Sequence, residues 1–159
     1  MNDLTSKSAQ KVQTELNRYG IALKVVEFSE STRTSQEAAD AIGCELGQIA
    51  KSLIFKGKTT KKPVFIIASG ANRVNEKKIK EIIGEKIEKA DAAFVLEHTG
   101  YAIGGVPPVG HKSSIKPFID EDLLKYKEIW SAAGTPHAVF ELTPDDLLKI
   151  TGGEVITVK

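Results

Sequence analysis

Two apolar segments, 50–56 and 63–69, are separated only by the six residues GKTTKK, and this spacing constrains the fold more than any other feature. Both segments are rich in Ile, Val and Phe and are bounded by turn-forming residues, which is typical of paired strands. The pattern predicts a β-hairpin with a cationic tip, so the fold has a sheet near the middle of the chain.

The rest of the chain alternates helical and extended patterns. Thr34 with Glu37, and Thr143 with Pro144, mark two helix starts. Helices are predicted at 6–19, 34–43, 75–83, 91–97 and from 143 to the Gly152-Gly153 pair, with a helical turn at 120–124; strands are predicted at 22–28, 116–119, 127–131, 137–142 and 154–159. This irregular order predicts a mixed α/β fold: a single domain over 1–159, with a curved, barrel-like mixed sheet surrounded by helices.

The composition is that of an ordinary globular protein. The chain has 159 residues, 41% hydrophobic and 27% charged, which excludes collagen, coiled-coil and disordered classes. No apolar run approaches the ~20 residues of a membrane helix, and the polar N-terminus shows no secretory signal. The single cysteine, Cys44, excludes an internal disulfide and suits a reducing compartment. We therefore expect a cytoplasmic protein in which Cys44 packs in the interior.

The net charge of +1 conceals an uneven distribution. Residues 1–50 carry −2, residues 51–90 carry +7 and residues 91–159 carry −4. A positive face of this kind attracts phosphate groups, although a solvated lysine surface has the same composition. The basic side chains of the hairpin tip and of the helix after it are Lys56, Lys58, Lys61, Lys62, Arg73, Lys77, Lys78 and Lys80.

Several common kinds of site have no motif in the sequence. The three histidines, at 98, 111 and 137, do not have metal-ligand spacing with one another or with Cys44. No G-x-S-x-G nucleophile elbow, Walker loop or dinucleotide fingerprint is present. We predict neither a metal nor a cofactor.

Lys51 interrupts the apolar strand IAKSLIF. Side chains alternate along a strand, so Lys51 shares a face with Ile49, Leu53 and Phe55. An ammonium group among apolar neighbours is costly unless it meets an anion. The lysine either extends to the strand end or faces a pocket that receives anions.

Two turns provide the other candidate site residues. Gly104-Gly105-Val106-Pro107-Pro108 combines glycines, which allow close backbone approach, with prolines, which hold the geometry. Such a turn can present N–H donors to an oxyanion, or it can be purely structural. His137, at the start of the strand AVFEL, can bind a ligand or serve as a structural residue.

The segments IAKSLIFK, TGYAIGGVPPVGH and GTPHAVFELTPDDLLKITGG together resemble the YbaK/ProX family of aminoacyl-tRNA deacylases over residues 20–157. The resemblance implies a mixed α/β domain that hydrolyses the ester of mischarged tRNA, typically tRNA(Pro), in trans and without metal. It places Lys51 at the lysine that holds the tRNA 3′ end. Gly104 to Pro108 match the G-x-x-x-P loop, and His137 matches a pocket histidine of some members.

The expected roles follow from this resemblance. Lys51 pairs with a phosphate, the amides of Gly104 and Gly105 polarise the ester carbonyl, and the remaining substrate contacts come from Pro107, Pro108, His137 and Asn72. The basic residues of the middle segment bind the acceptor stem and CCA end, and prolyl-tRNA synthetase is a possible supplier of the substrate.

The resemblance leaves three properties open. Pro107, Asn72 and Arg73 depart from the cysteine-specific branch, so alanine, cysteine, serine and 2-aminobutyrate all stay open as the amino acid removed. The oligomeric state is open as well. The alternative function is a non-catalytic module that binds aminoacyl-tRNA or an amino acid on the same fold.

Overall fold

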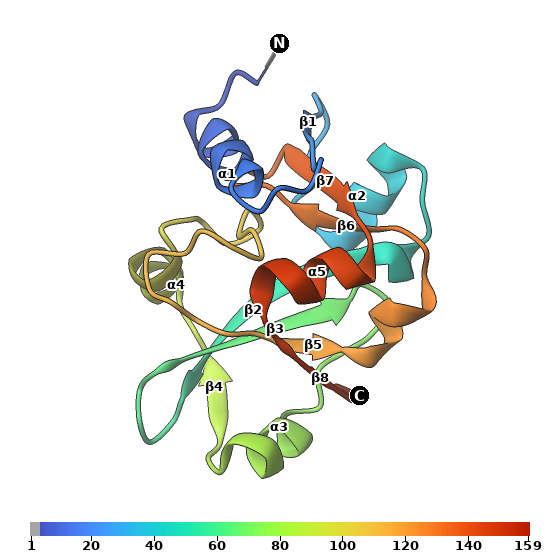
Figure 1. Cartoon of the computed structure of the whole chain (residues 1–159). Helices are drawn as coiled ribbons and strands as arrows, with labels where there is room; N and C mark the ends of the chain where they lie inside the picture. The colour runs from blue at the N-terminus through green and yellow to red at the C-terminus, as the bar shows by residue number, and fades with distance from the viewer. Residues whose placement is uncertain (1–3) are drawn as a thin grey trace.

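A computed structural model describes residues 4–159 and shows helices on both sides of a mixed β-sheet (Figure 1). The α-helices in this range are α1 (Lys7–Asn17), α2 (Ser35–Ile42), α3 (Glu76–Ile83), α4 (Ala92–Thr99) and α5 (Pro144–Thr151). The strands are β1 (Val25–Glu27), β2 (Ile49–Gly57), β3 (Pro63–Ser69), β4 (Ile87–Lys89), β5 (Phe118–Asp120), β6 (Ile129–Ala132), β7 (Ala138–Leu142) and β8 (Glu154–Ile156). Two 3₁₀ turns, Leu46–Gln48 and Glu121–Lys125, precede β2 and follow β5.

The predicted hairpin forms the centre of the sheet. The strand order is β1-β7-β6-β2-β3-β5-β8, and β4 pairs separately with β2. β2 and β3 are antiparallel over seven residue pairs, from Ala50↔Ser69 to Lys56↔Pro63. β6 joins β2 and β5 joins β3 in parallel, which makes the sheet mixed as predicted.

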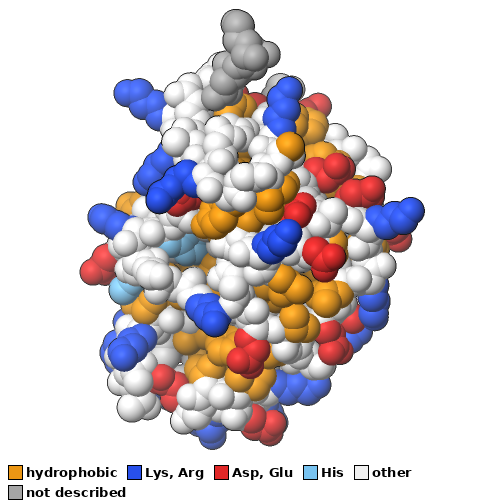
Figure 2. All heavy atoms as spheres, viewed as in Figure 1, with side chains coloured by type: hydrophobic (Ala, Val, Ile, Leu, Met, Phe, Trp, Pro, Cys, Tyr) orange, Lys and Arg blue, Asp and Glu red, His pale blue; other side chains and the backbone are white. Residues whose placement is uncertain are grey.

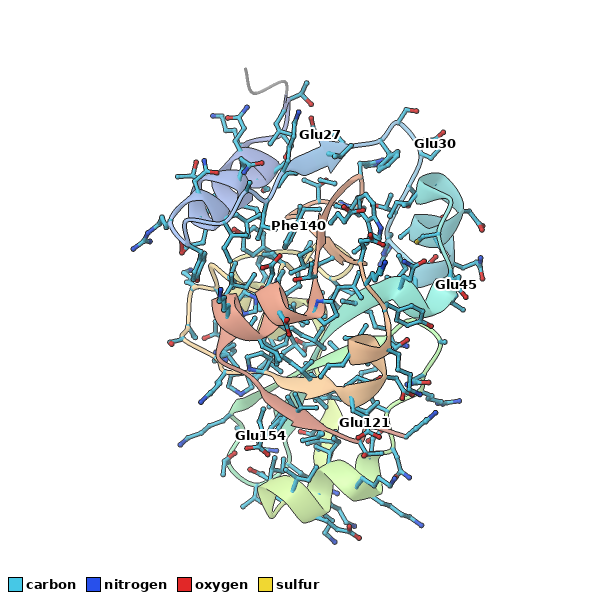
Figure 3. The ribbon with its side chains drawn as sticks, turned by 45° about the vertical axis from the view of Figure 1, so that its right-hand side comes forward. Glu27, Glu30, Glu45, Glu121, Phe140 and Glu154 are labelled. Atoms are coloured by element: carbon cyan, nitrogen blue, oxygen red, sulfur yellow. The ribbon has the colours of Figure 1, made fainter. Side chains whose placement is uncertain are left out.

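Alternation along β3 divides the core into two faces. Phe65 and Ile67 belong to the larger apolar cluster, with residues of α1, α4 and α5, and Phe140 lies in the same cluster (Figure 3). Ile66 and Ala68 point to the opposite face, where α3 packs. A third, smaller cluster joins α2 to Ile49 at the start of β2. The side chains on the same face of β2 as Ile49 therefore extend from the α2 cluster toward the α3 cluster.

Local signals identified most elements correctly. The predicted capping box forms at Thr34–Glu37, and Thr143 caps α5 as predicted, with Asp146 completing a capping box there as well. The prediction of 22–28 as one strand was too long, because only Val25–Glu27 pair with β7. β4 was not predicted, because its three residues IEK carry no apolar alternation and follow directly after the turn that ends α3.

One irregularity of the sheet creates the space for a site. β6 pairs with β2 only at Ile49↔Trp130 and Ala50↔Ser131, and β4 pairs with the same edge only from Phe55 onward. Between these ladders, residues 51–54 pair with β3 alone. β2 and β6 thus separate like the arms of a fork directly after Ala50.

Candidate functional site

A cavity of about 320 Å³ occupies the fork between β2 and β6. Its volume is at the small end of the range for ligand sites, roughly 300–1,000 Å³. Residues of β2, β6, the segment 32–35 before and at the start of α2, and the glycine turn line it, among them Lys51 and Gly104. The two principal elements of the predicted site therefore border one cavity.

The charged side chains that line this cavity are both positive. They are Arg33, in the segment before α2, and Lys51; no Asp or Glu is among the described residues that line it. Glu30 and Glu45 lie at the outer edge of the molecule, above and below α2 (Figure 3). The N-terminus of α2, with Thr34 and Ser35, also lines the cavity, and a helix N-terminus favours negative charge. The cavity is suited to an anionic or electron-rich group.

Lys51 is half-buried, and its Nζ donates a hydrogen bond to the backbone oxygen of Asn72 at 2.7 Å. Burial lowers the pKa of Lys51, and the charge of Asp120 partly opposes this effect by raising it. One of the three ammonium protons is held by Asn72, so the other two can be donated to a ligand. Lys51 lines the cavity, which agrees with the second of the two sequence interpretations, a lysine that faces a pocket.

Asn72, whose backbone oxygen accepts the hydrogen bond from Lys51, is itself held by two carboxylates. Its side-chain amide donates to Oδ2 of Asp120 and to Oδ2 of Asp122, both at 2.8 Å. Asp120 is 1% exposed and also accepts the N–H groups of Ser69 and Asp122. Asn72 was predicted to contact substrate, but it does not line the cavity, and both amide hydrogens are directed at carboxylates. The structure instead gives it contact with Lys51 through its main chain.

Gly104 has a φ of +92°, in the region that favours glycine. A Cβ added there would lie 2.5 Å from Cγ of Arg33, so the glycine lets the arginine approach the turn. Among the described residues, the N–H groups of Gly104 and Val106 have no acceptor, and both residues line the cavity. Free N–H donors beside an ammonium group can stabilise an oxyanion.

Gly105 has a structural role rather than the predicted role of hydrogen-bond donor to the ester carbonyl. Its N–H already donates to the oxygen of Ala102 at 3.0 Å, so it is not available to an ester carbonyl. A Cβ on Gly105 would lie about 2.9 Å from the backbone of Gly134 and Thr135. The tight packing of two turns explains this glycine. Val106, and not Gly105, has an N–H without an acceptor and lines the cavity.

The two prolines of the turn are buried and do not line the cavity. The carbonyl of Pro107 lies 2.5 Å from Nε2 of His111, whose ring packs against Phe65. Pro108 lines a separate surface depression with His111. These prolines, predicted as substrate contacts, hold the turn against the core.

His137 also lies away from the cavity lining. It is exposed, and its Nδ1 is 2.9 Å from the carbonyl oxygen of Glu30. The N–H of Phe28 bonds to the His137 oxygen, and that of Thr32 bonds to Pro136. The turn with His137 therefore holds the segment that carries Arg33.

Apart from Arg73, which directly follows Asn72 in the segment between β3 and α3, the predicted tRNA-binding side chains lie at the other end of β2. The hairpin tip and α3 form the lower end of the molecule in Figure 1, whereas α2 is at the upper right. At about 3.3 Å per residue, the tip is roughly 20 Å along β2 from Lys51. Lysines and arginines on the face in Figure 2 alternate with acidic side chains. Lys61 pairs with Glu88 at 3.5 Å, and Nζ of Lys56 lies over the ring of Phe94, so the basic surface is interrupted.

Other sequence expectations concern Cys44, metals and membranes. Cys44 is partly buried against the α2 cluster, and burial raises the pKa of its thiol. Within residues 4–159, no group of three or more His, Cys, Asp or Glu side chains is arranged to hold a metal ion. The described helices are all too short or too polar to cross a membrane.

Comparison with known proteins identifies the family and the fold. The sequence profile of the aminoacyl-tRNA editing domain matches residues 29–150. The chain belongs to the aminoacyl-tRNA editing domain family. The matched segment contains Arg33, Lys51, the glycine turn and β6, so all of the cavity lies inside the family domain.

Individual relatives agree with this assignment. The chain is 32% identical to the uncharacterized protein YwhH of Bacillus subtilis, over 93% of this chain and 94% of that protein. It is 29% identical to the Enterococcus faecalis protein named "Putative Cys-tRNA(Pro)/Cys-tRNA(Cys) deacylase EbsC", over 87% and 86%. A crystal structure described as "a putative trans-editing enzyme for prolyl tRNA synthetase" superposes with a TM-score of 0.91 at 47% identity, over 98% of this chain and 99% of that one.

The lining residues that the sequence patterns did not identify include Arg33, Trp130 and Ser131. Arg33 directly precedes the capping box of α2, which was a usable signal for a positive charge near a helix N-terminus. Trp130 and Ser131 reach the cavity through the parallel pairing of β6 with β2. That pairing joins segments about eighty residues apart, and local patterns do not encode it.

Proposed function

We propose that this protein is a trans-editing hydrolase that cleaves the ester of mischarged aminoacyl-tRNA, with tRNA(Pro) carrying a small non-cognate amino acid as its substrate. One observation carries the proposal: Lys51 and the free N–H groups of the glycine turn border the same small cavity. The names of EbsC and of the matching crystal structure support the choice of tRNA(Pro).

The proposed reaction uses this geometry for positioning and charge stabilisation. The oxygen of a water attacks the ester carbonyl, and the N–H groups of Gly104 and Val106 stabilise the oxyanion that forms. The carbonyl carbon then releases the ribose 3′ oxygen, which takes up a proton derived from the water. The products are a free amino acid and an intact tRNA 3′ end. An aminoacyl ester is already activated, so the step depends mainly on orientation.

The terminal nucleotide is bound at the mouth of the cavity in this proposal. Lys51 and Arg33 supply positive charge for its phosphate, and Trp130 supplies an aromatic ring near the base. Each stacked base contributes about 1–3 kcal/mol in single-strand complexes. Together, these groups account for binding of a CCA end without reading of a helical sequence.

The interrupted basic surface at the hairpin tip and α3 is the proposed contact for the acceptor stem. Phosphate contacts give affinity without sequence information. The acidic residues among the lysines keep this affinity modest, and a prolyl-tRNA synthetase is the proposed source of the mischarged tRNA.

The direct test is a deacylation panel. tRNA(Pro) charged separately with alanine, cysteine, serine, 2-aminobutyrate and, as the cognate control, proline is incubated with the protein, and release of each free amino acid is measured. We expect release of at least one small amino acid well above the uncatalysed rate, and no release of proline. Binding of the charged tRNAs without any release would instead establish the non-catalytic module.

A further inference from the structure

Two serine hydroxyls beside the cavity have no hydrogen-bond partner. Among the described residues, three buried side-chain oxygens or nitrogens lack a partner: Ser52 Oγ, Ser131 Oγ and Tyr101 Oη. Ser52 and Ser131 line the cavity in the fork, and Tyr101 does not. Buried polar groups in folded proteins are nearly always satisfied, so two unsatisfied hydroxyls at one cavity require an explanation.

The sheet places the two hydroxyls together. Ser131 lies opposite Ala50 in the β2–β6 ladder, and Ser52 is the next residue on the same face of β2. Both are on the face that packs the larger apolar cluster, because Ala50 and Phe140, the β7 partner of Ser131, belong to it. Lys51 points to the other face. Both serines thus line the cavity from the face opposite to Lys51, and their hydroxyl oxygens are buried in its wall without a partner.

Serine is a poor choice for this place unless something binds it. Ser131 is 1% exposed, and an alanine would fill the same position without leaving a donor unpaired. A site that hydrogen-bonds a hydroxyl of its substrate rejects an analogue without that group, because its own buried polar groups then stay unpaired. A purely apolar pocket cannot discriminate in this way.

We infer that Ser52 and Ser131 select an aminoacyl group whose small side chain carries a hydroxyl, so that seryl or threonyl esters are preferred over alanyl and 2-aminobutyryl esters. The inference rests on the proposed function, because it names the amino acid class that the same cavity accepts. One serine donates to the substrate hydroxyl and the other accepts from it, which gives each of the three hydroxyls at least one hydrogen bond.

The test measures binding and does not require turnover. Adenosine carrying a seryl or an alanyl group through a non-hydrolysable 3′-amide is titrated into the protein. Trp130, the single tryptophan, lines the cavity, so its fluorescence reports occupancy. We expect the seryl compound to bind on the order of 10-fold more tightly or better. The double variant Ser52→Ala/Ser131→Ala should bind the seryl and the alanyl compound with similar affinity.

Tyr101→Phe is the matched control. It removes the third unpartnered hydroxyl, which lies outside the cavity lining, and should leave the seryl-to-alanyl ratio unchanged. The serine variants should be at least as stable as the wild type in urea denaturation, because they remove an unsatisfied group.

Several outcomes overturn the inference. Equal affinity of the wild type for both compounds, a preference for alanyl, or no binding of either would do so. So would a ratio that persists in the double variant, or an equal weakening of both compounds, which would mean that the serines bind the α-amino group. Selective seryl binding without deacylation of any charged tRNA would support the inference and reject the proposed hydrolase.

Discussion

Asp120→Asn tests how the fold controls the charge of Lys51. Asp120 is buried and accepts three N–H groups, from Ser69, Asn72 and Asp122. An asparagine of the same shape has only one accepting oxygen. Whichever way the amide turns, at least one donor faces another donor.

The expected loss of stability follows from these contacts. A hydrogen bond to a charged group contributes about 1.5–3 kcal/mol, so loss of one predicts a decrease of roughly 2–3 kcal/mol in the free energy of unfolding. For a chain of this length, each kcal/mol corresponds to about 2–4 °C in the melting temperature. Urea denaturation and thermal melting measure both quantities.

The variant should also change the pH dependence of ligand binding. Burial lowers the pKa of Lys51, and Asp120 opposes this by raising it. Without the Asp120 charge the pKa falls further, so the ammonium form is lost at a lower pH. Binding of the 3′-amide adenosine, followed by Trp130 fluorescence, should therefore weaken on the alkaline side at a lower pH than in the wild type.

Asp122→Asn is the control for this experiment. Asp122 accepts from the same Asn72 amide and pairs with Lys125 and Lys159 near the surface, but its charge is not a cause of the Lys51 shift. In Asp122→Asn, ligand binding should weaken on the alkaline side at the same pH as in the wild type. If Asp120→Asn lost binding at the same alkaline pH as the wild type, or kept full stability, the proposed link from Asp120 to Lys51 would be refuted.

Three further predictions concern the turn, the basic surface and a buried histidine. Gly105→Ala should lower the unfolding free energy by about 1–3 kcal/mol, because its Cβ would meet the neighbouring turn; wild-type stability in urea would contradict this packing. Charge reversal of Lys61 and Lys62 should weaken tRNA binding and reduce its salt dependence, whereas reversal of Lys149 on α5 should not; equal effects would remove the hairpin tip from the interface. Burial lowers the pKa of His111, so the folded protein favours the neutral imidazole. The resulting stability is fully present at a pH above the ordinary histidine pKa of about 6.5, and it is lost as the pH falls through the lowered pKa. The stability difference between wild type and His111→Asn should shrink on acidification, and a constant difference would contradict this assignment.

The sequence predicted the parts of the site whose signals are local. Lys51 stands out because a charge interrupts an apolar strand, and Gly104 because its turn combines glycines and prolines. Both border the cavity. The hairpin and the capped helices were recognised for the same reason.

The parts that the sequence did not predict depend on contacts between distant segments. Trp130 and Ser131 reach the cavity that Lys51 lines only because β6 pairs in parallel with β2 for two residues and then diverges. Asn72 was assigned to the substrate, yet its amide is held by two carboxylates almost fifty residues away in the chain. Gly105 was assigned as a donor, although its N–H is already bonded within the turn. Strand register and hydrogen-bond direction decide all of these.

The most direct test of the proposed function is the single-turnover rate of amino-acid release from mischarged tRNA(Pro), measured with wild-type protein and with Lys51→Met. Removal of the ammonium group that is proposed to position the terminal phosphate should lower the rate on the order of 100-fold or more, because small displacements of the ester are costly. The far-ultraviolet circular dichroism spectrum and the cooperative urea transition should persist, because the half-buried charge already carries a desolvation cost. A folded Lys51→Met protein that releases the amino acid at the wild-type rate would contradict the proposed role of this cavity.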